Sequence, residues 1–351
     1  MTPVTPGRPA DITKAFPRLG PLARTATRLH PRPGPVTLND SSIGGPLLWP
    51  ADEPWPYCDG PHVRAFGRLS TPSLADVRLL RDIEADSYGR ARTELEQAVL
   101  DRIRASSLTP GRPLEVSPVA LAETRGVPAE PIAMLPVAQL YARDVPSLRP
   151  PAGADLLQVL WCPFSHEDEL TLRTRLFWRA SGEVADILAE QPEPEAVQSE
   201  YFVPNVCQLH PEPVVEYPAP DPAEGIDAAL SEALCEWSAA QHYQDLDEAF
   251  YSSQLSVAPG CKVGGWAPWS TTDAVTLACT ACGAPMDPLL TIASWEWGGD
   301  GYSWIPYEDQ NEPDDYPRPH EPTGLMLGDA GKQQLFICSA DPTHGHTALF
   351  L

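Results

Sequence analysis

The residues with the clearest chemical pattern lie in the C-terminal part of the chain. Cys279 and Cys282 are separated by two residues, in the sequence Cys279-Thr280-Ala281-Cys282-Gly283. This C-x-x-C spacing lets two thiolates bind one metal ion from a tight turn, and the following glycine allows the backbone to fold beneath the ion. The pattern predicts half of a structural zinc site.

A second segment supplies the other half of this predicted site. Cys338 ends the apolar run Gln334–Cys338, and His344 and His346 follow it. With the C-x-x-C pair, Cys338 and one histidine would give zinc a four-coordinate Cys3His ligand set. We prefer His344 because five residues separate it from Cys338 and leave room for a turn back to the ion, with His346 as the alternative. Without a metal, the cysteines would be free buried thiols and the histidines unrelated to them.

Two stretches of the chain have the same pattern around a pair of glycines. Ser42–Trp49 (SIGGPLLW) and Lys262–Trp269 (KVGGWAPW) each have a β-branched residue, Gly-Gly, three residues and Trp. Such pairs predict a strand that ends in a sharp turn, and no phosphate-binding glycine pattern is present. Cys58 lies 13 residues after the first pair, and Cys279 lies 14 after the second. The similarity indicates an internal repeat.

The predicted repeat extends to two pairs of strands. Met134–Gln139 resembles Leu289–Ser294, and Leu156–Cys162 resembles Gln334–Cys338. If the halves are equivalent, the first half has candidate ligands for a second, weaker metal site at the corresponding positions. These ligands are Cys58, His62, Cys162 and His166. The alternative is that both cysteines belong to the core and both histidines to the solvated surface. One zinc ion is therefore expected, and two are possible.

The overall composition excludes several classes of protein. The chain has 351 residues and no run of about 18 apolar residues, so no membrane-spanning segment is expected. The N-terminal residues lack a continuous apolar stretch, which argues against a signal peptide. Eight cysteines are too sparse for a secreted disulfide scaffold, and we expect a protein of the reducing cytoplasm.

The charge of the chain bears on its partners. The formal net charge is −24 and the isoelectric point is about 4.6. Binding to nucleic acid requires a basic surface, so we do not expect it. An acidic surface favours a basic protein partner, although the same charge can serve solubility alone.

The order of elements predicts an α+β fold with two pseudo-repeated β-rich halves and inserted helices, stabilised by zinc. Residues 1–40 are expected to be a poorly packed lead-in, and residues 41–180 the first half, with a helical insertion at about 71–105. A helical connector at 181–255 leads into the second half at 256–351. Predicted helices are 71–105 with Ser73 as N-cap, Glu183–Ala189 and Asp227–Tyr243. Predicted strands are Met134–Tyr141, Asp155–Trp161, Thr174–Trp178, Leu289–Trp297, Gln334–Cys338 and His346–Leu351.

Several of these motifs resemble a known family. Ser42-Ile43-Gly44-Gly45, the strand Leu135–Leu140, and Lys262-Val263-Gly264-Gly265 with its C-x-x-C resemble the YwqG-like family of uncharacterised bacterial proteins. The resemblance covers most of the chain from about residue 40 onward, apart from the helical insertion. The motifs are also distantly similar to programmed-cell-death protein 2 and its relatives, although the prolines (Pro46, Pro268) are shifted here.

The two resemblances imply different partners. Programmed-cell-death protein 2 and its relatives are cytoplasmic chaperones that hold a newly made ribosomal protein. YwqG-like domains are found among proteins thought to neutralise bacterial toxins. Neither resemblance implies a catalytic residue.

These observations favour a non-catalytic, zinc-containing module that binds a basic protein, as an immunity protein or a chaperone-like holder. No complete H-E-x-x-H or G-x-S-x-G motif is present, so no catalytic residues are predicted. A long loop rich in acids and aromatics supplies candidate contacts for an arginine- or lysine-rich partner. The aromatic residues are Trp297, Tyr302, Trp304 and Tyr307. The alternative function is a zinc-dependent hydrolase with an open metal position.

Overall fold

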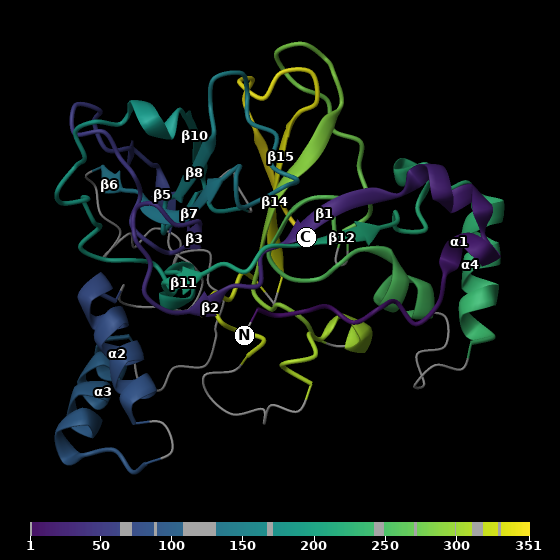
Figure 1. The fold of residues 1–351 in the computed structure, drawn as a ribbon. Coiled ribbons are helices and arrows are strands. Elements are labelled where there is room, and N and C mark those ends of the chain that lie inside the picture. Colours follow the sequence, from purple (N-terminus) through teal and green to yellow (C-terminus); the bar gives the residue numbers. More distant parts are fainter. Residues whose placement is uncertain are drawn as a thin grey trace, which may run out of the picture.

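Two six-stranded antiparallel sheets form the centre of the molecule (Figure 1). The structure is a computed structural model that describes residues 2–63, 72–87, 90–107, 131–166, 171–241, 249–269, 272–298, 300–310, 319–328 and 331–351. Sheet A contains, in spatial order, β12 (Glu212–Glu216), β1 (Arg24–Arg28), β13 (Lys262–Gly264), β14 (Met286–Ala293), β15 (Lys332–Cys338) and β16 (Thr347–Phe350). Sheet B contains β10 (Thr174–Arg179), β8 (Leu156–Trp161), β7 (Leu135–Tyr141), β3 (Ser42–Ile43), β11 (Cys207–Gln208) and β2 (Arg32–Pro33). Two short pairs accompany them, β4 (Tyr57–Cys58) with β6 (Ile132–Ala133), and β5 (His62–Val63) with β9 (Ser165–His166).

The helices lie at the two ends of this body (Figure 1). The α-helices are α1 (Ile12–Ala15), α2 (Leu74–Asp86), α3 (Glu94–Ser107) and α4 (Ala228–Ala239). Short 3-10 turns are η1 (Pro17–Leu22), η3 (Ser181–Glu183), η4 (Glu200–Phe202), η5 (Pro222–Glu224) and η8 (Tyr302–Trp304), and η7 (Ser252–Ser256) is a π turn. None of the helices in the described ranges is long and apolar enough to cross a membrane.

In each sheet, four strands lie side by side in the order in which they follow one another along the chain. β3, β7, β8 and β10 are neighbours in sheet B, as β13, β14, β15 and β16 are in sheet A. Ser42 lies opposite Gln139, and Lys262 lies opposite Thr291. The register shifts after Pro136 in β7 and after Pro288 in β14, so both long strands have an irregularity at the same place.

The sequence alignment of the two long strands was wrong by three residues. Similarity of residue types matches Gln139 with Ser294. In the ladders the residue that corresponds to Gln139 is Thr291, three positions earlier, because Ser42 lies opposite Gln139 and Lys262 lies opposite Thr291. β7 is buried along nearly its whole length and β14 over its last five residues, so the hydrophobic pattern there contains little information on register.

The N-terminal segment is not the poorly packed lead-in expected from its proline and arginine content. It does contain the short helix α1, but β1 lies inside sheet A, paired with β12 on one side and β13 on the other. Arg28 of this strand is fully buried, and its guanidinium donates hydrogen bonds to the carbonyl oxygens of Trp304 and Glu296. These acceptors bind both terminal nitrogens of the guanidinium and offset much of the cost of burying an arginine in a central strand, although Nε has no partner among the described residues.

At two places, consecutive strands of the chain belong to different six-stranded sheets. β1 belongs to sheet A while β2, which follows it directly, is the edge strand of sheet B. The reverse holds later, since β11 belongs to sheet B and β12 is the edge of sheet A. The segment expected to be a helical connector therefore contributes strands to both sheets, in addition to α4.

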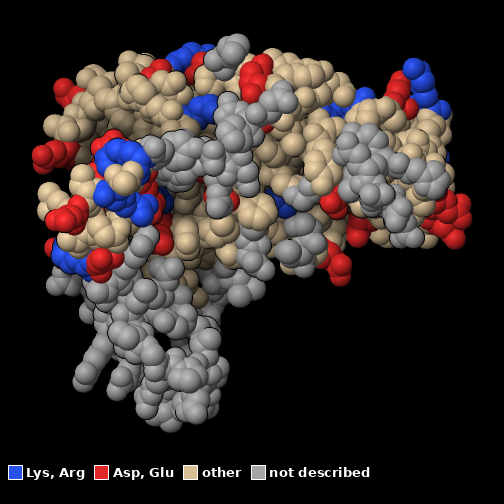
Figure 2. Space-filling model, turned by 90° about the horizontal axis from the view of Figure 1, so that it is seen from below, with Lys and Arg blue, Asp and Glu red and all other residues tan. Residues whose placement is uncertain are grey.

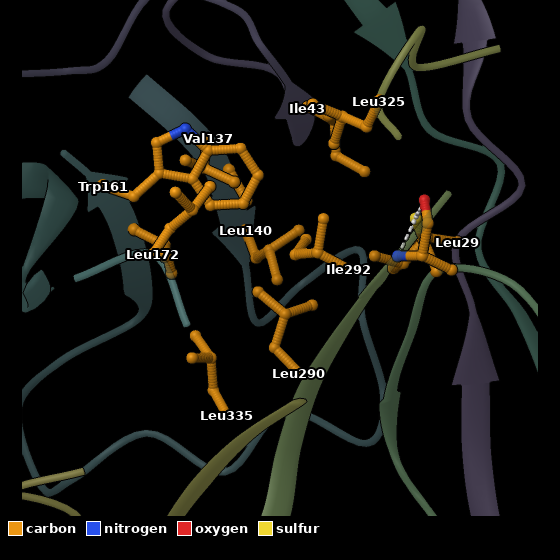
Figure 3. Close-up of a cluster of buried hydrophobic side chains, with 14 of the residues drawn as sticks. Leu29, Ile43, Val137, Leu140, Trp161, Leu172, Leu290, Ile292, Leu325 and Leu335 are labelled. Carbon is orange, nitrogen blue, oxygen red and sulfur yellow. Dashed lines mark hydrogen bonds between the residues drawn. The ribbon is translucent and has the colours of Figure 1, made fainter. Parts of the chain in front are cut away.

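One hydrophobic core joins the sheets. Val137, Leu140 and Trp161 come from the sheet B side and meet Leu290, Ile292 and Leu335 of sheet A (Figure 3). Burying one such aliphatic side chain contributes on the order of 2 kcal/mol. The core thus holds the ends of β8 and β15, where two of the predicted metal ligands lie, in fixed positions.

The predicted helices and strands agree with the structure in most places. The helical insertion is confirmed by α2 and α3, and the hydroxyl of Ser73 accepts a hydrogen bond from the backbone of Asp76 as an N-cap. β14 begins and ends earlier than expected, so Trp297 lies outside it. Parts of three predictions lie outside the described residues: 71 and 88–89 of the helical insertion, 242–243 of the helix at Asp227–Tyr243, and 311–318 of the loop rich in acids and aromatics.

The helix predicted at Glu183–Ala189 is wrong. A 3-10 turn ends at Glu183, and Ile187 then forms a bridge with Pro50. The backbone N–H of Leu188 donates to the carbonyl of Trp49, which gives this segment partners in an extended conformation.

Candidate metal centres

The predicted C-terminal ligands form one cluster, called here the C-terminal centre. Its members are Cys279, Cys282, Cys338 and His344. The two cysteines of the C-x-x-C motif lie in a hairpin turn that is closed by a bridge between Ala278 and Pro285. The backbone N–H of Gly283 donates to the carbonyl of Cys279 at 2.8 Å, and Gly283 has a φ of +73°. A side chain would strain this left-handed position, so the glycine lets the turn fold back on itself.

The end of β15 brings the third cysteine to the turn. Cys338 is the last residue of β15 and lies opposite Met286, the first residue of β14. Its Sγ is 3.5 Å from Cys282 Sγ, and Cys279 Sγ is 3.6 Å from His344 Nδ1. Two sulfurs bound to one tetrahedral zinc at about 2.3 Å each would be separated by about 3.8 Å. The thiol spacing therefore fits a shared ion.

The structure resolves the choice between the two C-terminal histidines. His344 reaches the cluster through a turn in which its backbone N–H donates to the carbonyl of Asp341. His346 instead places Nε2 2.6 Å from Thr174 Oγ1 on β10 of the other sheet. The cluster that could hold a metal ion therefore contains His344 and not His346.

The first-half candidates also form one cluster, called here the N-terminal centre. Its members are Cys58, His62, Cys162 and His166, and their ligand atoms, like those of the C-terminal centre, lie within 4.8 Å of one another. His62 and His166 are directly opposite in the β5–β9 pair, with ring centroids 5.0 Å apart. Cys58 Sγ is 3.2 Å from His166 Nε2. Two separate C-x-x-x-H motifs thus supply one four-residue cluster.

The loop between Cys58 and His62 depends on a glycine. Gly60 has a φ of +81°, and a Cβ there would lie only 3.0 Å from the backbone nitrogen of His62. Arg173 braces the same loop, since Nη1 donates to the carbonyl of Gly60 at 3.0 Å and lies 3.8 Å from Cys58 Sγ. The guanidinium places a positive charge beside this thiol.

Hydrogen bonding between the two thiols of the N-terminal centre moves their pKa values in opposite directions. The bond to Cys162, reinforced by His166, lowers the pKa of Cys58, and the same bond raises the pKa of Cys162. Cys58 is therefore the more acidic thiol, and Cys162 is the one that keeps its proton. A bound cation would displace it and let both cysteines act as thiolates.

The two centres differ in their exposure to solvent. In the N-terminal centre Cys58, Cys162 and His166 are buried, and Nε2 of His62 is buried with no hydrogen-bond partner among the described residues. In the C-terminal centre, Cys282 is exposed and His344 is partly exposed. The first centre is the more buried, with only His62 partly exposed, whereas the second lies at the molecular surface.

The chemistry of both donor sets fits a zinc ion. Thiolate and imidazole are the ligands of structural zinc, and four of them complete a tetrahedral shell. The second nitrogen of His344 is 3.7 Å from an Asp341 carboxylate oxygen, which can orient the ring, as carboxylates do for many metal-bound histidines. Both clusters could hold a metal ion, and the ligand sets are Cys3His and Cys2His2.

No family model matches this chain, and no curated protein sequence matches it. The resemblance to the YwqG-like family and to programmed-cell-death protein 2 stays a prediction from the motifs. What the protein does must therefore be inferred from its own residues.

The predicted partner-binding aromatics divide into two groups. Trp297 and Trp304 are buried, at 9% and 1% exposure, so they are not surface anchors as predicted. The Nε1 of Trp304 donates to the carbonyl of Ser253, and Arg8 covers its ring. Tyr302 and Tyr307 are exposed at 46% and 57% and remain available to a partner.

A groove that the sequence gave no sign of lies beside the helical insertion. It has a volume of about 1610 Å³ and runs between α2 and the segments around Glu200 and Gly324, with Gly44 and Gly45 also in its wall. The charged side chains among its described lining residues are Arg78, Arg81, Asp82, Glu84, Glu193, Glu200 and Glu321. We call this feature the α2 groove. It depends on where the insertion packs, which is why no local motif marks it.

The acids of the α2 groove outnumber its bases, and its arginines have partners of their own. Arg78 pairs with Glu193, and Arg81 donates to the carbonyl oxygens of Glu200 and Gly324. The groove therefore presents an excess of negative charge.

Proposed function

We propose that both centres hold zinc and that the ions are structural. The observation that carries this proposal is that each cluster brings four protein donors within 4.8 Å. Four such donors leave a tetrahedral ion no position for water or substrate. Each ion would tie the end of one long strand, β8 or β15, to a loop that lies more than fifty residues away in sequence.

We further propose that the two halves derive from one duplicated unit. Gln158 lies opposite Gln139, and Gln334 lies opposite Thr291. Cys162 and Cys338 each follow these glutamines by four residues (162 − 158 and 338 − 334). The two metal centres would then be descendants of one ancestral site, with Cys58 and His62 replacing the C-x-x-C pair.

The proposed role of this zinc-bound scaffold is to bind a basic protein, as an immunity protein or a chaperone-like holder does. The chain has a net charge of −24, and the α2 groove contains five acidic and two basic side chains among its described lining residues. On the described part of the face in Figure 2, Lys and Arg form only small groups among the acidic residues. Thiolate centres of this kind persist in a reducing compartment, which supports a cytoplasmic location.

Charge reversal tests the groove as the binding surface. The variant Asp82→Lys/Glu200→Lys should lose most of the partner captured from the native host under mild cross-linking. Its matched control, Asp52→Lys/Asp273→Lys, changes the net charge equally at exposed sites elsewhere and should retain the partner. Equal loss in both variants would show that only the total charge matters, and the groove assignment would fail.

A hydrolase with an open metal position is the competing function, and Co²⁺ substitution separates the two. A closed tetrahedral Co²⁺ centre keeps its visible spectrum when azide or cyanide is added. An open position binds the anion and changes the spectrum. We expect no change, and a saturable change would favour the hydrolase.

A further inference from the structure

The N-terminal residues Pro3–Arg8, called here the arm, lie on the surface as an extended segment. They form no helix or strand, and Pro3 is the only one of them that is buried. The arm therefore buries little apolar surface. Its position depends mainly on polar contacts, which a competing segment of the same chemistry could make equally well.

The guanidinium of Arg8 is held in a site that matches its shape. It lies 3.5 Å from the centre of the Trp304 ring. Nη1 donates to the carbonyl of Gln254 and to Oγ of Ser303, at 3.2 and 3.1 Å. Nη2 donates to the carbonyl of Ser303 at 2.7 Å. A planar cation with several donors fits this arrangement, whereas lysine would lose most of the contacts.

A second site, three residues earlier in the arm, recognises a hydroxyl group. The Thr5 hydroxyl donates to the carboxylate of Glu212, and it accepts from Arg28 Nη1 at 2.8 Å. The Thr5 backbone N–H also donates to Glu212, at 3.0 Å. The proton and one lone pair of this hydroxyl are thereby bound by charged groups.

The arm also pairs through its backbone with the acid-rich loop. The N–H of Val4 donates to Glu308 Oε2 at 2.9 Å, and the carbonyl of Val4 accepts from the N–H of Tyr307 at 3.0 Å. These contacts depend only on an extended backbone. They are the kind that a peptide from another protein can reproduce.

The residues that receive the arm are called here the arm seat. They are Arg28, Glu212, Gln254, Ser303, Trp304 and Glu308. Gln254 is fully buried in the π turn η7, and its side-chain oxygen accepts from the backbone N–H of Ser303. Arg28 Nη1 donates to the carbonyl oxygen of Trp304 at 2.8 Å. These contacts do not involve the arm, and such ordering of the seat reduces the entropic cost of binding.

We propose that the arm seat is a peptide-recognition site for an extended segment with a hydroxyl residue three positions before an arginine. The arm occupies the seat in the absence of a partner, and a partner segment of this chemistry replaces it. The proposal rests on the proposed function in one respect, because it names the chemistry of a basic protein partner. The sequence predicts that the acids and aromatics of the loop contact an arginine-rich partner. In the structure, Trp304 of this loop contacts Arg8 of the chain itself.

The test uses the zinc-replete full chain and a synthetic peptide of residues 2–10 with a C-terminal fluorophore. Deletion of residues 2–8 should give a protein that binds this peptide saturably in fluorescence anisotropy. The intact chain should bind it at least tenfold more weakly, because the arm competes. A peptide with Arg8→Gln, or one with Thr5→Val, should bind the deletion variant at least tenfold more weakly than the native peptide.

A second variant controls for misfolding that the deletion of residues 2–8 could cause. The full-length Thr5→Val/Arg8→Gln chain keeps its length but loses both anchors, so it should bind the native peptide as the deletion variant does. Failure of both variants to bind the peptide, or equal binding of the Arg8→Gln peptide, would overturn the proposal. Neither result bears on the zinc content or on the α2 groove, so failure here is distinct from failure of the proposed function.

Discussion

His62 and His166 lie directly opposite each other on β5 and β9, with ring centroids 5.0 Å apart. This pairing converts two weak C-x-x-x-H motifs into a joint site, because Cys58 and Cys162 are brought to the same place. It is also the part of the predicted metal chemistry that no local spacing could establish. The consequences for stability and metal content can be measured.

Removal of a ligand should destabilise the N-terminal centre more than the C-terminal one. Cys162→Ser should lower the free energy of unfolding by on the order of 3 kcal/mol or more, because it weakens metal binding and leaves a poor ligand buried. Cys282→Ser should cost less, since Cys282 is exposed. Denaturant unfolding of both zinc-loaded variants gives the comparison, and an equal or reversed order would contradict the internal placement of the first centre.

The two histidines near the C-terminus should differ in their effect on metal content. His344→Ala should reduce the bound zinc by one ion per chain, because its Nδ1 faces Cys279. His346→Ala should keep the zinc and lose only the contact with Thr174. Elemental analysis of the two variants distinguishes them, and loss of zinc from His346→Ala would reassign the ligand.

A chelator should remove the two ions one after the other. A strong chelator should first take the ion from the C-terminal centre, whose Cys282 and His344 reach the surface. The second ion should leave more slowly, because three of the four ligands of the N-terminal centre are buried and become accessible mainly through local unfolding. A colorimetric zinc assay over time should show two phases, and Cys279→Ser should abolish the faster one. A single phase would argue against this difference.

The burial of His30 should make the protein less stable at mildly acidic pH. Burial lowers the pKa of His30 to about 4, from an ordinary value of 6.5. Because the unfolded chain takes up this proton first as the pH falls, stability is lost between pH 6.5 and pH 4, by about 2 kcal/mol between pH 7 and pH 4.5. His30→Asn removes the titrating group and keeps a residue that tolerates the φ of +43°.

A comparison of the native chain with His30→Asn isolates the effect of His30 titration on the free energy of unfolding. Urea unfolding at pH 7 and pH 4.5 should show a smaller loss of stability in His30→Asn than in the native chain. Equal losses would mean that His30 does not titrate in this range. Groups that do not contact His30, including the metal ligands, contribute equally to both proteins and cancel in the difference.

The sequence predicted features that depend on local residue types. The C-x-x-C-Gly turn, the N-cap at Ser73 and the apolar strands around Cys162 and Cys338 all have local signals, and the structure contains them. The ligand set of the C-terminal centre followed from such signals, apart from the choice of histidine.

Features that depend on distant contacts could not be predicted. β1 was missed because Arg28 is buried, and its burial depends on acceptors elsewhere in the chain, which are the carbonyl groups of Trp304 and Glu296 and the hydroxyl of Thr5. Lys262 is likewise buried in β13 beside Glu216, with Nζ 2.6 Å from its carboxylate. The roles of Trp297 and Trp304 were misjudged for the same reason, since what covers them is another segment of the chain.

We propose that this scaffold holds two structural zinc ions, one at the end of β8 and one at the end of β15. Elemental analysis of the purified chain, expressed without a metal-binding tag, measures this directly as zinc per polypeptide. We predict a value near two, falling to one in Cys279→Ser and to one in Cys58→Ser. A value of zero in the native chain would contradict the account, and a value of one that is unaffected by Cys58→Ser would refute the second centre.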